Sequence, residues 1–106
     1  MSSATELTNL VIDFLYRAGA YPWRASSVGV YDKQRATFRA SAKKGVSDVL
    51  ACYRGRLIAV EIKIGKDKLS PEQTGFIENV RHAGGIAFVA TDFEQFKKEW
   101  SEVIHT

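Results

Sequence analysis

The stretch from residue 44 to residue 63 restricts the fold more than any other part of the chain. Two runs rich in Val, Ile, Leu and Tyr flank the dipeptide Arg54-Gly55, which predicts a β-hairpin with a two-residue turn. If the residues on either side of this dipeptide pair, counting outward along the strands brings Asp48 opposite Glu61. Their Cβ atoms are then about 5 Å apart on one face. Lys63 projects from the same face, because strand side chains alternate.

Two opposed carboxylates destabilise a strand pair unless something compensates for their repulsion. A hard cation such as Mg²⁺ or Mn²⁺ fits between them, because it typically takes one or two carboxylates together with water and substrate phosphate. An ammonium beside such an ion can orient or deprotonate a water molecule, or stabilise charge on phosphate. The alternative is a simple ion pair at the end of a strand, which contributes little to stability.

Several motifs resemble a known nuclease family. Asp48 followed by Glu61-Ile62-Lys63 is similar to the D…(D/E)xK signature of the PD-(D/E)xK nucleases. Together with Gly45 and the run Leu69-Ser70-Pro71-Glu72-Gln73, it resembles the virus-type replication–repair nuclease (VRR-NUC) domain in a small stand-alone form. The resemblance extends from the first predicted helix to about Thr91. Ser47 stands where this family often has a proline that is not a ligand.

The resemblance implies an α/β fold with a restriction-endonuclease-like core, of the kind used by Holliday-junction resolvases. We expect a mixed sheet of about four strands flanked by helices, in the order α-β-β-β-α-β-α. In such a site Asp48, Glu61 and the carbonyl of Ile62 hold Mg²⁺ or Mn²⁺, and Lys63 positions or activates the attacking water. The resemblance also assigns Glu6 to the metal, directly or through water, and places Gln73 at the border of the active site.

Glu6 and Gln73 also have structural explanations, because each lies three residues after a serine that precedes a predicted helix. Ser3 with Glu6 has the pattern of a capping box, and Gln73 occupies the same position after Ser70 and Pro71. In the second helix Gln73 follows the apolar spacing, so its amide is expected to face the sheet. The first helix has a core-facing stripe and ends at Gly19. The stripe consists of Leu7, Leu10, Val11, Phe14, Leu15 and Ala18.

The remaining segments complete the expected core. Residues 28–39 are predicted to form one or two weak strands in an exposed loop or protruding hairpin. The apolar run 86–90 predicts a buried strand, parallel to its neighbour because a helix separates the two. Asp92 is expected to cap a last helix with an apolar stripe from Phe93 to Ile104. Cys52, in the middle of a strand, is expected to be a small buried hydrophobe.

Positive charge is concentrated before the hairpin. Residues 17–44 contain seven basic side chains and one acidic one, a local charge of +6 in a chain of net charge +3. Interleaved aromatic residues make this the pattern expected for contact with a phosphate backbone, although a solvated charged face is the alternative. Trp23 is expected to plug the end of the sheet rather than to stack on a strand. The candidate DNA-binding residues are Arg24, Arg35, Arg39, Lys43 and Lys44.

The composition sets further expectations. A length of 106 residues predicts a single domain over residues 1–106. No apolar run reaches membrane-spanning length and the N-terminus lacks the regions of a signal peptide, so we expect no membrane partner and a cytoplasmic location, in a bacterium or a phage-infected host. One cysteine and two histidines offer no zinc-site spacing, so no zinc site is expected. The glycines form no phosphate loop, and no organic cofactor is expected.

These observations predict a Mg²⁺-dependent endodeoxyribonuclease. A chain of this size has one active site, whereas cutting two strands of a four-way junction requires two, so a C₂ homodimer acting on Holliday junctions or other branched DNA is expected. Roles in recombination or repair would follow. The alternatives are a flap or nicking endonuclease, and a DNA-binding module in which the same polar residues form only a structural network.

Overall fold

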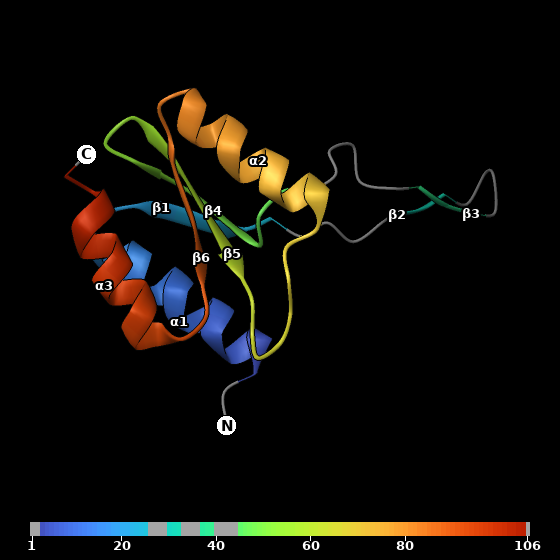
Figure 1. Ribbon diagram of the computed structural model, residues 1–106, viewed down its shortest axis with the longest axis horizontal. Coiled ribbons are helices and arrows are strands. Elements are labelled where there is room, and N and C mark those ends of the chain that lie inside the picture. The colour runs from blue at the N-terminus through green and yellow to red at the C-terminus, as the bar shows by residue number, and fades with distance from the viewer. Residues whose placement is uncertain (1–2, 26–29, 33–36, 40–44, 106) are drawn as a thin grey trace.

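The structure is a computed structural model that describes residues 3–25, 30–32, 37–39 and 45–105 (Figure 1). Its helices are α1 (Ala4–Arg17), α2 (Pro71–His82) and α3 (Phe93–Val103). Its strands are β1 (Tyr21–Arg24), β2 (Val30–Asp32), β3 (Thr37–Arg39), β4 (Val49–Tyr53), β5 (Arg56–Ile62) and β6 (Ile86–Ala90). Without β2 and β3, the order of elements is the predicted α-β-β-β-α-β-α.

Four strands form one mixed sheet in the order β1-β4-β5-β6. The pairs β1–β4 and β4–β5 are antiparallel, whereas β5 and β6 are parallel because α2 carries the chain back across the sheet. Tyr53 pairs with Arg56, which confirms the predicted register of the hairpin. Arg54 and Gly55 both have positive φ, 51° and 81°, as a two-residue turn matched to the strand twist requires.

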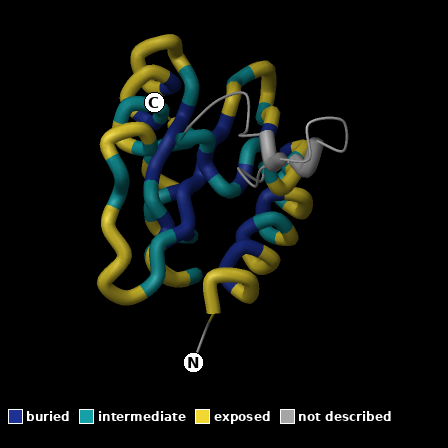
Figure 2. Tube along the Cα trace, turned by 90° about the vertical axis from the view of Figure 1, so that its right-hand side faces the viewer, coloured by how far each residue is buried: buried dark blue, intermediate teal, exposed yellow. Residues whose placement is uncertain are grey.

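The two faces of this sheet are covered differently. Alternate strand residues face α1 and α3 and form the larger apolar cluster, with Leu7 and Leu15 of α1 and Phe96 and Trp100 of α3. The other strand residues face α2, where Ala59 and Ala87 meet Ile77 and Val80 in a smaller cluster. Figure 2 shows the buried segments where helices and sheet meet.

Side-chain hydrogen bonds define where the helices begin. The hydroxyl oxygen of Ser3 accepts from the amide of Glu6, and the carboxylate of Asp92 accepts from the amide of Gln95. Ser70 and Gln73 form a reciprocal capping box at the start of α2, with Pro71 in the first turn. These bonds satisfy amide donors that have no partner within the helix.

The segment before the site contains the expected hairpin. Strands β2 and β3 pair with each other, Tyr31 opposite Phe38, and form a two-stranded sheet separate from the main one. In Figure 1 this pair lies away from the body formed by the sheet and the three helices.

Two expectations about burial were wrong. Leu10 is 43% exposed, and its predicted place on the buried side of α1 is taken by Thr8. Cys52 is exposed, because it lies on the α2 side of β4, where α2 does not extend. None of the described helices is long and apolar enough to cross a membrane.

Candidate active site

The β4–β5 hairpin brings Asp48 to Glu61 at its open end. The ladder runs to the pair Val49–Val60, so the next residues outward are Asp48 and Glu61. The amide of Ile62 donates to Oδ2 of Asp48 over 2.8 Å, which fixes that carboxylate against β5. The carbonyl of Asp48 accepts from the amide of Ala25 over 2.9 Å, just beyond the end of β1. Asp48 is thus held from both neighbouring strands.

Glu61 is the most unusual side chain in the described structure. It is 2% exposed, and its Oε2 atom is buried without a hydrogen-bond donor among the described residues. Burial raises the pKa of Glu61 from 4.5 to about 8, helped by the hydrogen bond and negative charge of Asp48 and opposed by the positive charge of Lys63. Without a cation, Glu61 therefore keeps its proton near neutral pH.

Gln73 connects the start of α2 to this pair. Its Oε1 atom accepts from the amide of Ser70 over 2.9 Å, and its Nε2 atom donates to Oε1 of Glu61 over 3.4 Å. The predicted capping role and the predicted position beside the site are therefore both present, because the two ends of one amide serve them separately. In this arrangement the amide oxygen of Gln73 bonds to the start of α2, and only the NH₂ group of Gln73 faces Glu61.

Gly45 allows α2 to approach the loop that precedes Asp48. Its φ is +79°, and a Cβ atom there would overlap the carbonyl of Glu72 and lie 2.8 Å from the amide nitrogen of Gln73. A glycine is therefore favoured at position 45 both by the close approach of α2 and by the positive φ. The close contact sets the position of Gln73 relative to Asp48.

Lys63 follows β5 by one residue and is half-buried. Its amide donates to the carbonyl of Ala90 over 3.0 Å, so the extended path of β5 continues beside β6. Alternation puts its side chain on the face of Glu61. The effect of its charge on the pKa of Glu61 agrees with that placement.

Ser47 is a polar residue whose importance the sequence did not indicate. Its side chain is fully buried next to Asp48, and its hydroxyl oxygen has no hydrogen-bond partner among the described residues. Ser47 and Glu61 therefore each carry a buried polar atom without a partner among the described residues. Such atoms are rare in folded proteins and are typical of sites that bind a ligand or an ion.

Glu6 lies apart from the two carboxylates. Its side chain is exposed in the first turn of α1. Within the described part of the chain, no three His, Cys, Asp or Glu side chains gather closely enough to hold a metal ion by themselves. A role for Glu6 at the metal stays a prediction.

Of the five candidate DNA-binding residues, only Arg24 has a described side chain. It is exposed at the end of β1, and its guanidinium donates to Oδ1 of Asn9 over 3.3 Å. Arg35, Lys43 and Lys44 lie outside the described residues, and for Arg39 only the strand position in β3 is described. Trp23 is 41% exposed, so the expectation that it plugs the sheet was wrong.

The residues present fit a small divalent cation. A cation beside Glu61 would supply the missing partner of Oε2 and offset the repulsion from Asp48. Two carboxylates, with water and phosphate as the remaining ligands, are the donor set that Mg²⁺ and Mn²⁺ prefer. Asp48, Glu61 and the backbone carbonyl of Ile62 are the groups available to hold it.

Among solved structures, the chain is similar to Hjc of Archaeoglobus fulgidus, a Holliday junction resolvase from an archaeal hyperthermophile. The match has a TM-score of 0.56 and 24% sequence identity, and it covers 83% of this chain and 67% of the resolvase chain. The chain has a restriction-endonuclease-like fold. The predicted fold class is therefore confirmed. No family model and no curated protein matches the chain.

Proposed function

We propose that this chain is a divalent-metal-dependent endodeoxyribonuclease that cuts four-way junctions or other branched DNA as a homodimer. The observation that carries the proposal is the buried Glu61 carboxylate, which has an unpartnered oxygen and lies against Asp48 at one end of the sheet. A buried pair of acids costs stability unless it serves a cation or a proton. The fold supports the proposal, because the similar archaeal protein is a Holliday junction resolvase.

In the proposed reaction, water attacks phosphorus and one P–O bond of the DNA strand breaks. Asp48, Glu61 and the Ile62 carbonyl would hold Mg²⁺ or Mn²⁺, which supplies positive charge to the phosphate and lowers the pKa of water. Lys63 would orient the attacking water or take its proton. Gln73 would hold Glu61 in place through its NH₂ group.

Glu6 and the basic residues complete the proposal. Glu6 would reach the cation only through water, because its side chain lies apart from Asp48 and Glu61. Arg24 lies one residue before Ala25, whose amide donates to the carbonyl of Asp48, and would contact a phosphate farther along the bound DNA. Basic side chains in this region would supply most of the affinity for DNA and make it depend on salt.

The motif residues support the assignment to the VRR-NUC nucleases, and the number of active sites per chain supports a branched substrate. The motif set around Gly45, Asp48, Glu61, Lys63 and Gln73 resembles the stand-alone VRR-NUC nucleases. One active site per chain cuts one strand, so resolving a symmetric junction takes two copies related by a two-fold axis. A protein of this kind would act in recombination or repair in the cytoplasm.

The first test is cleavage of labelled four-way junction, flap and linear duplex with Mg²⁺, Mn²⁺ or EDTA. The proposal predicts paired symmetric cuts in the junction with either metal and none in EDTA. Cutting of flaps only would indicate the flap endonuclease alternative. Binding without cleavage under every metal condition would indicate the DNA-binding module and contradict the proposal.

Two substitutions test the assigned residues. Asp48→Asn should reduce cleavage by about 10³-fold or more, and Lys63→Ala by about 10²- to 10⁴-fold, with junction affinity nearly unchanged. Lys66→Ala is the matched control, because Lys66 is an exposed lysine in the turn after β5 and should cut at the wild-type rate. Wild-type cutting by Lys63→Ala would show that Lys63 has no catalytic role.

A further inference from the structure

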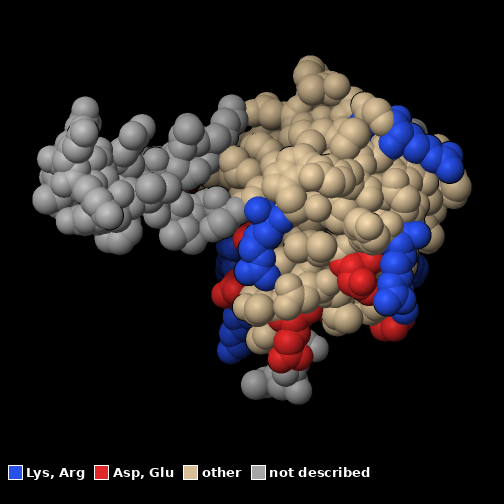
Figure 3. Space-filling view, turned by 180° about the vertical axis from the view of Figure 1, so that it is seen from behind, with Lys and Arg blue, Asp and Glu red and all other residues tan. Residues whose placement is uncertain are grey.

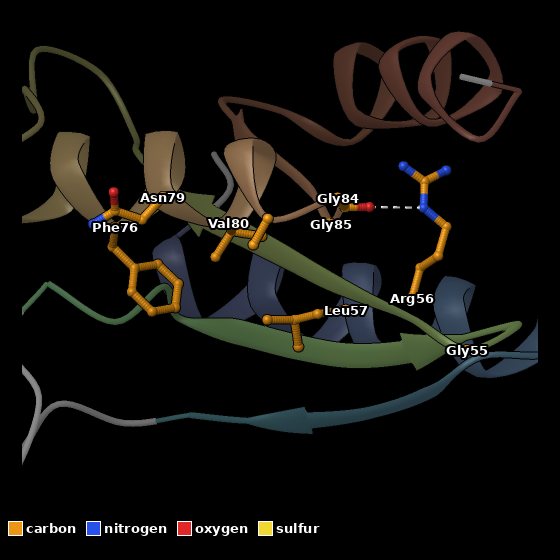
Figure 4. Close-up of a pocket in the computed structure, with 9 residues that line it drawn as sticks. Gly55, Arg56, Leu57, Phe76, Asn79, Val80, Gly84 and Gly85 are labelled. Atoms are coloured by element: carbon orange, nitrogen blue, oxygen red, sulfur yellow. Dashed lines mark hydrogen bonds between the residues drawn. The ribbon is translucent and has the colours of Figure 1, made fainter.

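Within the described part of the chain, half of one face of the main sheet has no helix over it. The pairs Tyr21–Cys52, Trp23–Leu50 and Cys52–Leu57 place these five side chains on the α2 side of the sheet. Among the described elements, α2 packs on β5 and β6 only, so β1 and β4 are not covered there. Figure 4 shows α2 above β5, with β4 and β1 running below it without a helix in front. We call these five residues the open face.

The open face is apolar, and four of its five residues are exposed, whereas Leu50 is half-buried against the cluster under α2. Tyr21 is 71% exposed, Trp23 41% and Leu57 39%, and Cys52 is also exposed. The rings of Tyr21 and Trp23 lie 6.0 Å apart and form one aromatic projection. Seen from behind, Figure 3 has a broad upper area without Lys, Arg, Asp or Glu, with charged side chains only at its margins. Contiguous apolar surface of this kind marks an interaction site.

A groove adjoins the open face at Leu57. It lies between the hairpin and α2, has a volume of about 340 Å³, and is lined by Leu57, Phe76, Val80 and Gly85 among others. Figure 4 shows the side chains of Leu57 and Val80 on its two sides. A Cβ atom on Gly85 would lie 2.6 Å from Cγ1 of Val80, so the glycine lets the chain pass close to α2. The same side of the sheet thus has a projection at one edge and a hollow at the other.

We propose that the open face and this groove form the surface on which a second copy of the chain docks. In a two-fold arrangement each copy presents the same patch, so the Tyr21–Trp23 projection of one copy can enter the groove of the other. A projection and a hollow on one patch are what such self-complementary pairing requires. This inference rests on the proposed function, in which two active sites must act on one junction.

The charge distribution favours a second copy over DNA as the occupant. A phosphate backbone is bound by Lys and Arg, and none of the five residues of the open face is charged. The core of a homodimer interface, by contrast, is depleted of charge and enriched in Tyr, Trp and Leu-like apolar side chains. An interface of standard size takes about 800 Å² from each partner, more than five residues supply, so the groove must take part as well.

The position of the open face fits this arrangement. Leu50 is two residues from Asp48 on the same strand face, so the docking surface begins beside the candidate active site. Docking through it fixes the separation of the two sites in the dimer, because both belong to the same sheet. That separation would decide which two phosphates of a branched DNA are cut together.

The mass of the particle in solution tests the proposal. By sedimentation equilibrium, wild-type protein should have twice the mass of one chain, and Leu57→Lys should weaken self-association by a factor of about 30 or more. Leu10→Lys is the matched control, because Leu10 has a similar exposure, 43%, on α1, which covers the opposite sheet face. A wild-type monomer at high micromolar concentration would overturn the proposal.

The thiol of Cys52 gives a second readout that does not depend on any substitution. Its labelling by a soluble thiol reagent should slow as protein concentration rises, because docking covers it. Tyr21→Lys, at a position exposed enough to leave the fold intact, should restore fast labelling. A dimer that persists in both lysine variants, with Cys52 still labelled rapidly, would place the interface elsewhere. Protection of Cys52 by single-stranded DNA in the monomer would make this face a nucleobase platform instead.

These results separate the interface from the chemistry. Asp48→Asn should remain a dimer although it does not cut, so a failed nuclease assay leaves the mass measurement valid. If Leu57→Lys is a monomer, it should nick single strands yet lose paired cutting of the junction. Loss of paired cutting cannot then be assigned to repulsion of DNA, since the substitution adds a positive charge.

Discussion

The two faces of the central sheet differ in how they are covered and in what they carry. On the α1–α3 face, Phe14, Phe88, Phe96 and Trp100 join in edge-to-face and stacked contacts, and every strand residue in the cluster is apolar. On the α2 face one helix covers half of the surface, and the described strand residues include the buried acid Glu61.

This difference indicates a division of roles. Apolar burial contributes most of the free energy of folding, and the α1–α3 face contains most of it. The α2 face retains a buried carboxylate without a full set of partners, which reduces stability, and an exposed apolar strip, which adds none in the isolated chain. Features that a fold tolerates at a cost are usually those that function requires.

The largest effect should come from opening a cavity on the α1–α3 face. Phe96 is fully buried between the rings of Phe14 and Phe88, at 5.3 and 5.7 Å, so Phe96→Ala should lower the free energy of unfolding by about 3 to 5 kcal/mol. Leu57→Ala on the open face should cost less than about 1 kcal/mol in the monomer. Urea unfolding at low protein concentration measures both. Equal losses would contradict the division between the faces.

The next effect is a pH dependence that originates at Glu61. Because its pKa is about 8 in the folded protein and 4.5 ordinarily, the folded state keeps a proton that the unfolded state has lost. The contribution of Glu61 to the free energy of unfolding of metal-free protein should therefore be largest below pH 4.5 and fall by about 2 to 4 kcal/mol as pH rises to 8. Urea midpoints in EDTA across this range measure the fall.

Glu61→Gln is the control for that prediction, since it should remove most of the fall. Mg²⁺ should act in the opposite direction. It binds the ionised carboxylates, so the stabilisation that it adds should grow between pH 6 and pH 9 in the wild type and be absent in Glu61→Gln. A pH-independent effect of Mg²⁺ would indicate binding elsewhere.

A smaller effect is expected from Gly45→Ala on the α2 face. The new methyl group meets the backbone of Glu72 and Gln73 at a positive φ, which should cost about 1 to 3 kcal/mol and displace the Gln73 amide from Glu61. Cleavage should fall together with stability. Gly75→Ala is the control, because nothing lies within 4 Å of a Cβ atom there and helix propensity predicts a gain of about 0.5 to 1 kcal/mol. Unchanged cleavage by Gly45→Ala would mean that Gln73 needs no such placement.

The β4–β5 hairpin and the pairing of Asp48 with Glu61 could be predicted from local sequence for a physical reason. Arg54-Gly55 accepts the two positive φ values of the turn, and once the turn is set, pairing carries Asp48 to Glu61 without any long-range information. The helix starts were predicted equally well, because Ser70, Gln73 and Asp92 make their capping bonds within three residues.

The coverage of the sheet could not be predicted in this way. Cys52 lies in β4, which is apolar on both faces, so alternation does not show which face of that strand a helix covers. Where α2 crosses depends on the connection through residues 63–70 and on the close contact at Gly45, both of which are tertiary. For the same reason the sequence indicated two uses for Gln73 as alternatives, whereas the structure has both.

The two-ended amide of Gln73 has one further consequence. Phe76, in the wall of the groove, follows Gln73 by one turn of α2. The same helix therefore contributes a side chain to the proposed docking surface and the amide that donates to Glu61.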